Sequence, residues 1–139
     1  MSRMLTQKLY DVVTLYECMQ DPATMAWLVH LDVPLPPVTP SGRYPEPARI
    51  REIIESIPGI QADYLISESV WQVSVRSRND ISWAILTVKA YSGDPHTAHE
   101  FYFSAGWDEM ILMVTSNLAK YCGPLVLMHD SGALPQVVV

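Results

Sequence analysis

The stretch that most constrains the fold of this chain is its last third, residues 101–139. It opens with the aromatic run Phe101–Phe103, which is typical of a β-strand, and Gly106 interrupts that run. The acidic pair Asp108 and Glu109 favours a helix start, because the N-terminal end of a helix carries a partial positive charge. Apolar residues then recur at helical spacing and predict a helix with one buried face: Met110, Ile111, Val114, Leu118 and Tyr121.

The end of this helix is as clearly marked as its beginning. Gly123 supplies the positive-φ conformation that commonly follows the last helical turn, and Pro124 cannot continue a helix. We therefore expect the helix to end at residue 121 or 122 and a strand to follow at 124–128. The Val137 end of the chain is a candidate for an additional edge strand.

Three further helices are expected in the first 60 residues. Apolar residues at helical spacing favour a helix from Leu5 to Met19, although the β-branched run at 12–14 leaves a strand open over residues 9–17. Asp21-Pro22 is a favourable start for the second helix. The third helix is expected between Glu46-Pro47 and Pro58-Gly59.

After the third helix the apolar period changes to two. This alternation predicts strands near 70–76 and 81–90, followed by a loop from Ser92 and a short strand near 100–104. Combined with the strand at 124–128, these elements predict an α+β fold with an antiparallel sheet of about four strands and helices packed mainly on one face. A length of 139 residues suits a single domain spanning residues 1–139.

The net charge and the apolar content of the chain indicate what kind of partner it could bind. The chain has 9 Lys and Arg against 15 Asp and Glu, a net charge of −6, which argues against nonspecific nucleic-acid binding and favours a basic protein partner. Solubility alone is the alternative explanation of this charge. With 49% apolar and only 17% charged residues, we also expect an apolar surface patch that meets a partner or forms a homodimer.

The N-terminus lacks the apolar core of a signal peptide, and no stretch approaches the ~20 apolar residues that span a bilayer. Two cysteines, Cys18 and Cys122, do not make a disulfide framework. We therefore expect a cytoplasmic protein that does not contact a membrane.

One cluster has spacing that resembles a metal site. His96 and His99 are followed by Glu100, but the order differs from the metalloprotease motif H-E-x-x-H. Gly93 and Pro95 indicate a loop, in which two histidines do not form a closed site. We expect no metal and no other cofactor.

No catalytic set is expected either. His129-Asp130-Ser131 contains the residue types of a hydrolase triad, but adjacent side chains point apart, and the run is typical of a turn. Cys122 is placed at a helix C-terminus, which raises a thiol pKa and disfavours a nucleophile. The alternative is a small enzyme or ligand-binding domain with a pocket near four polar residues: His96, His99, Glu100 and His129.

Aromatic and acidic residues supply the candidate partner-binding site. We expect Trp71 and Trp83 in the core, whereas Trp107, just beyond Gly106, is the candidate for an exposed anchor. Acidic residues near the ends of the sheet would steer a basic partner to that anchor; they are Asp94, Glu100, Asp108 and Glu109.

The C-terminal third also resembles small bacterial immunity proteins, the antidotes encoded beside polymorphic or contact-delivered toxins. The residues that carry the resemblance are Phe101-Tyr-Phe-Ser104, Gly106-Trp107, Leu118-Ala119, Cys122-Gly-Pro-Leu-Val-Leu127, Asp130-Ser-Gly132 and Pro135. The resemblance implies a small acidic α+β domain without catalytic residues that occludes the active site of a cognate toxin. No contact residue is carried over from it.

Overall fold

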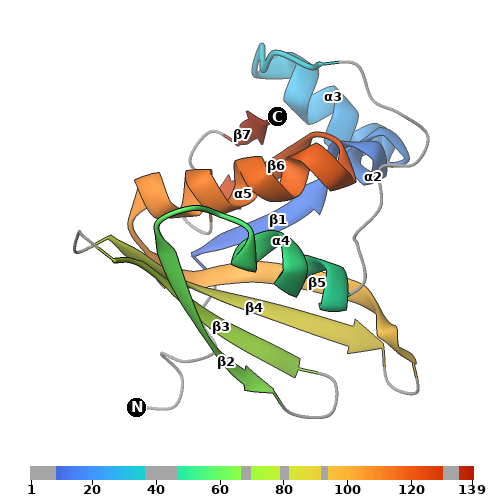
Figure 1. The fold of residues 1–139 in the computed structure, drawn as a ribbon. Coiled ribbons are helices and arrows are strands. Elements are labelled where there is room, and N and C mark those ends of the chain that lie inside the picture. Colours follow the sequence, from blue (N-terminus) through green and yellow to red (C-terminus); the bar gives the residue numbers. More distant parts are fainter. Residues whose placement is uncertain (1–8, 37–46, 67–69, 79–81, 92–93, 130–134) are drawn as a thin grey trace, which may run out of the picture.

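A seven-stranded antiparallel sheet and four helices make up the described part of the chain (Figure 1). The computed structural model describes residues 9–36, 47–66, 70–78, 82–91, 94–129 and 135–139, without the side chains of residues 47, 48, 66, 90, 91, 94–100 and 122. The strands are β1 (Tyr10–Thr14), β2 (Ile60–Ile66), β3 (Val70–Ser77), β4 (Trp83–Tyr91), β5 (Asp94–Gly106), β6 (Leu125–His129) and β7 (Gln136–Val138). The helices are α2 (Leu15–Met19), α3 (Pro22–His30), α4 (Pro47–Glu55) and α5 (Asp108–Cys122).

The strand order in the sheet is β2-β3-β4-β5-β1-β6-β7. Strands β2 to β5 follow one another along the chain, but β1 lies between β5 and β6. Tyr10 at the start of β1 is paired with Phe103 of β5 on one side and with His129 of β6 on the other. Helix α5 connects β5 to β6 across one face of the sheet, so β1 fills the space between the two strands that this helix joins.

The main core lies between this face and the pair α4 and α5. Helix α4 contributes one buried stripe at helical spacing, Ile50, Ile53, Ile54 and Ile57, and α5 contributes Met110, Ile111, Val114 and Leu118. The sheet contributes alternate residues of its strands, such as Val73 and Val75 of β3, because successive strand residues face opposite sides. The expected apolar stripe of α5 is thus confirmed as part of the core, except for Tyr121, which is 56% exposed.

A second, smaller cluster lies on the opposite face of β1, β6 and β7. Val126 belongs to it, whereas its neighbours Leu125 and Leu127 belong to the main core. Leu15, Cys18 and Leu28 from α2 and α3 cover this face. Helices therefore lie on both faces at this end of the sheet, and only α4 and α5 fit the expectation of packing on one face.

Helix α3 ends in a motif that ties it to this cluster. Asp32 has φ 57°, and its N–H donates to the carbonyl of Val29 at 3.0 Å, while Val33 N–H donates to Leu28 carbonyl at 3.2 Å. These two bonds define a Schellman ending, and Leu28 and Val33 pack together below it. A residue with a Cβ atom, Asp32, occupies the position that glycine usually takes.

Most of the local expectations for the C-terminal third are confirmed. Helix α5 ends at Cys122, and Gly123 has φ 78° and ψ −177°, a conformation essentially restricted to glycine. Strands β3 and β4 lie where the period-two pattern placed them, β6 follows the helix end as expected, and β7 forms the additional strand at the Val137 end.

Three expectations about the sheet are wrong. It has seven strands rather than about four, because β1 and β2 add to the expected set, together with the candidate edge strand β7. Residues 10–14, expected in a helix, form β1, as the open alternative allowed, since pairing on both sides overrides the local helical pattern. The expected loop after Ser92 is instead the first part of β5, which pairs with β4 through irregular register shifts after Lys89.

None of the described helices combines the length and the apolar character that crossing a bilayer requires.

Candidate functional site

The corner of the sheet where β5 ends and α5 begins is shaped by a close backbone approach. Gly106 has φ 149°, and a Cβ atom there would lie 2.7 Å from both Cα and Cβ of Ala84. The next residue, Trp107, donates its backbone N–H to the carbonyl of Trp83 at 2.8 Å. Glycine thus allows β4 and the start of α5 to come together, and it brings two tryptophans to neighbouring points of the surface.

Both of these tryptophans are exposed. Trp107 is 47% exposed, as expected for an anchor, but Trp83 is 41% exposed and was expected in the core. The expectation for Trp83 is wrong because Ala84, Leu86 and Val88 form the core side of β4, so Trp83 lies on the other face, away from α4 and α5. Trp71 is half-buried and does pack against the main core.

Two carboxylates directly follow Trp107 in the chain. Asp108 and Glu109 occupy the exposed first turn of α5, where the helix dipole favours negative charge. Among the described residues, no Lys or Arg forms an ion pair with either carboxylate.

Tyr10 links this corner to the end of β6. Its hydroxyl donates to Asp108 Oδ1 at 3.4 Å, and its ring meets the His129 ring edge-on with centroids 4.8 Å apart. Burial raises the pKa of the Tyr10 hydroxyl, and the charge and hydrogen bond of Asp108 raise it further, so Tyr10 stays a neutral donor. We call this surface the tryptophan corner; it consists of Tyr10, Trp83, Trp107, Asp108, Glu109 and His129.

The structure does not bring the other two acidic candidates to the tryptophan corner. Glu100 is paired with Lys89, and Asp94 with Tyr91, toward the opposite end of β5. At the rise of a β-strand, Asp94 lies roughly 30–40 Å along the strand from Trp107. The side chains of both residues lie outside the described part, and their contribution to binding stays a prediction.

Of the alternative pocket near His96, His99, Glu100 and His129, only the side chain of His129 lies in the described part. The backbone of His96 and His99 belongs to β5, not to a loop, and their side chains lie outside the described part. His129 is in contact with Tyr10 at the tryptophan corner. In the residues that are described, no three His, Cys, Asp or Glu side chains group in a way that holds a metal ion.

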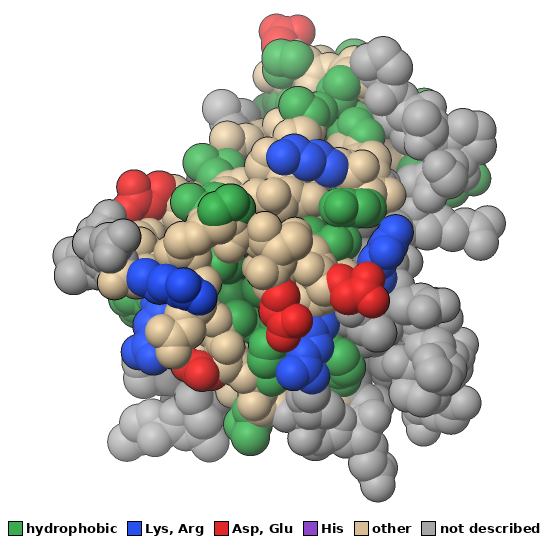
Figure 2. All heavy atoms as spheres, in the orientation of Figure 1, with side chains coloured by type: hydrophobic (Ala, Val, Ile, Leu, Met, Phe, Trp, Pro, Cys, Tyr) green, Lys and Arg blue, Asp and Glu red, His purple; other side chains and the backbone are tan. Residues whose placement is uncertain are grey.

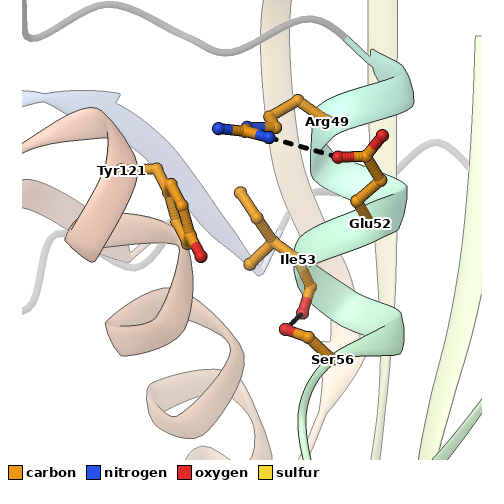
Figure 3. Close-up of a pocket in the computed structure, with 5 residues that line it drawn as sticks. All are labelled: Arg49, Glu52, Ile53, Ser56 and Tyr121. Carbon is orange, nitrogen blue, oxygen red and sulfur yellow. Dashed lines mark hydrogen bonds and ion pairs between the residues drawn. The ribbon is translucent and has the colours of Figure 1, made fainter.

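A small pocket between α4 and α5 has polar walls but little chemical capacity (Figure 3). Its volume is about 70 Å³, well below the ~300 Å³ at which small-molecule sites begin. Arg49 bonds Glu52 at 3.2 Å and lies over the Tyr121 ring, and Ser56 donates to the carbonyl of Ile53 at 2.6 Å. These polar groups are already engaged with one another, so the pocket is a packing defect between two helices.

Comparisons with known proteins do not identify the chain: no protein-family model, no curated protein and no solved structure matches it.

Proposed function

We propose that this protein is a non-enzymatic binding protein that neutralises a cognate protein toxin by occluding its active site, and that it acts in the bacterial cytoplasm. The observation that supports the binding proposal is the tryptophan corner, where two exposed tryptophans are joined by a backbone hydrogen bond and Trp107 is followed by two exposed carboxylates with no ion pair among the described residues. The toxin and the bacterial setting come from the resemblance of the C-terminal third to immunity proteins.

The composition of the tryptophan corner suits a protein partner. Tryptophans are enriched among the residues that contribute most to protein–protein affinity, because a large ring is desolvated with little loss of side-chain entropy. Trp83 and Trp107 each leave a large part of such a ring exposed to water. The carboxylates of Asp108 and Glu109 would meet a basic contact face and speed its approach, since the chain as a whole carries a net charge of −6.

The experiment is a kinetic binding measurement against the protein encoded beside this chain's gene, at low and high ionic strength. Trp107→Ala should raise the dissociation rate by about tenfold or more, because loss of an anchor appears in dissociation. The double variant Asp108→Asn with Glu109→Gln should mainly lower the association rate, since rim charges act during encounter.

Matched controls lie elsewhere on the surface. Trp27→Ala removes another exposed tryptophan, and Glu52→Gln with Glu55→Gln removes two exposed carboxylates of α4; neither change should alter the binding rates. Association that does not slow as salt rises would remove the electrostatic part of the proposal. Absence of binding to the neighbouring gene product would contradict the toxin-inhibitor assignment.

A further inference from the structure

A hollow of about 300 Å³ lies between the segment that follows α3 and the segment of β7. Its volume reaches the ~300 Å³ at which small-molecule sites begin, unlike that of the pocket between α4 and α5. Asp32 and Gln136 are the polar residues of its lining. The other residues that line it are apolar: Leu31, Val33, Pro34, Pro135 and Val137. The hollow therefore combines apolar walls with one carboxylate.

The end of α3 holds the backbone of Asp32 in place. Hydrogen bonds to the carbonyls of Leu28 and Val29 close the chain on either side of this residue. Asp32 is the single residue other than glycine with a positive φ in the described part of the chain. Because this backbone is already fixed, little of its freedom would be lost when the carboxylate meets a ligand.

The charge around the hollow is negative. Residues 9–36 include four acidic residues and no Lys or Arg, and residues 121–139 include one acidic residue and no Lys or Arg. Lys120, which precedes the second of these segments, does not line the hollow. Among the described residues, the exposed Asp32 forms no ion pair. This distribution of charge attracts cations to the hollow and repels anions.

We propose that this hollow binds an alkylguanidinium group, whose charged end pairs with Asp32 while its apolar chain lies against the proline and valine residues of the walls. A guanidinium is planar, is less strongly hydrated than an ammonium and can form two hydrogen bonds with one carboxylate. The side chain of an arginine on another protein and a free guanidine compound share this chemistry. The hollow shares no residue with the tryptophan corner, so this binding is independent of the proposed toxin binding.

Other classes of ligand fit the hollow less well. A divalent metal ion requires several oxygen ligands, and the described residues contain no group of three His, Cys, Asp or Glu that could hold one. A purely apolar ligand would leave Asp32 without a partner. An exposed ion pair contributes little by itself, so binding requires the apolar chain as well as the charge.

The test is a titration of the whole chain with n-butylguanidinium at constant ionic strength, followed by NMR. We expect the amide signals of residues 31–33 and 136–138 to shift with a Kd of about 1 mM. n-Butylurea has nearly the same shape without the charge and should bind about fivefold more weakly. Guanidinium without an alkyl chain should also bind more weakly, because it makes no contact with the apolar walls.

Variants of the chain separate the role of Asp32 from that of the overall negative charge. Asp32→Asn should weaken binding by about fivefold, and it should fold because Asn tolerates a positive φ. Glu17→Gln removes one exposed negative charge on α2 and should leave the Kd unchanged. Gln136→Lys, at an exposed lining position, introduces a competing cation and should also weaken binding. Melting curves verify that the three variants fold.

The same titration distinguishes the two sources of the ligand. N-acetyl-arginine methylamide carries the guanidinium on a peptide-like backbone, so binding as tight as that of n-butylguanidinium assigns the site to an arginine of another protein. Binding that is about tenfold weaker assigns it to a free guanidine compound, because the backbone then does not fit. The proposal is overturned if the signals stay unshifted up to about 20 mM, if n-butylurea binds equally well, or if Asp32→Asn binds as the unaltered chain does.

Discussion

The two edges of this sheet, β2 and β7, lie in surroundings that differ in charge. Beside β2, α4 and β3 carry paired charges: Arg49 with Glu52, Arg51 with Glu55, and Arg76 with Asp63. Beside β7, α3 contains no Asp, Glu, Lys or Arg, and the exposed Asp32 beyond its end forms no ion pair among the described residues. Figure 2 shows this division on one face: charged side chains gather over α4 and the nearby strands, and few lie over α3 and α5.

The two edges of the sheet therefore differ in how well charge protects them from pairing with another strand. Paired charges make the β2 edge a poor template for another strand and contribute little to stability, because exposed ion pairs are worth less than about 1 kcal/mol. Around β7, no ion pair of this kind is found among the described residues. The following predictions compare the free energy of unfolding after changes at three places: the close contact at Gly106, the buried thiol near β7, and the exposed ion pair beside β2.

The largest change in stability is expected at Gly106, between the two edges of the sheet, where the chain passes close to Ala84 of β4. Gly106→Ala should destabilise the protein by about 3 kcal/mol or more, because the new Cβ would lie 2.7 Å from Ala84 and the φ of 149° is strained for alanine. Urea denaturation measures the change. Gly59→Ala is the control, since its φ is also positive at 76° but nothing lies within 4 Å of the new Cβ; it should cost about 1 kcal/mol. Equal costs at the two glycines would show that the approach to Ala84 does not matter.

The second prediction creates a buried charge at the β7 end of the sheet. Cys18 of α2 is buried, and burial, followed by the charges of Glu17 and Asp21, raises the pKa of its thiol from 9.0 to about 11. The folded state therefore favours the neutral thiol. The stabilisation this gives is complete below pH 9 and is lost as the pH rises through about 11.

The loss should amount to about 2 kcal/mol. The measurement is the unfolding free energy of the native protein minus that of Cys18→Ala at several pH values, a difference in which the tyrosines cancel. A difference that stays constant from neutral pH to pH 11 would contradict a buried, neutral thiol.

The smallest effect is expected from removing charge beside β2. Asp63→Asn breaks an exposed ion pair at 3.7 Å, so the unfolding free energy should change by less than about 0.5 kcal/mol. Thermal melting at low and high salt measures it, with Glu52→Gln on α4 as the comparison pair. A loss above about 1 kcal/mol would mean that charge holds this end together instead of merely shielding its edge.

The features that could be predicted from the sequence are those set by residues close to them in the chain. The start and end of α5 were predictable because Asp108, Glu109 and Gly123 act within one helical turn of where they stand. The exposure of Trp107 followed from its position just beyond Gly106. Strand β2 was missed although Ile60, Ala62 and Tyr64 alternate with exposed residues, because the 70% exposed Leu65 blurs that period.

The remaining features depend on distant parts of the chain. A strand pattern shows that Trp83 and Ala84 face opposite sides of β4, but the positions of α4 and α5 decide which side is buried. Likewise, nothing local indicates that residues 10–14 pair with both β5 and β6, or that Tyr10 reaches Asp108. The strand order therefore brings the tryptophan corner together. The sequence alone indicated Trp107, Asp108 and Glu109 as binding candidates, but not that Tyr10, Trp83 and His129 join them.

The insertion of β1 between β5 and β6 has a consequence for the order in which the molecule assembles. Strands β2 to β5 pair with their neighbours along the chain and can form as soon as each hairpin is complete, whereas Tyr10 pairs with residues more than 90 positions away. Closing so long a loop is slow, and β1 has no second neighbour until β6 has been synthesised. A growing chain that ends before residue 125 thus leaves β1 as an unpaired edge, and translation of the last 15 residues converts that edge into the interior of the sheet.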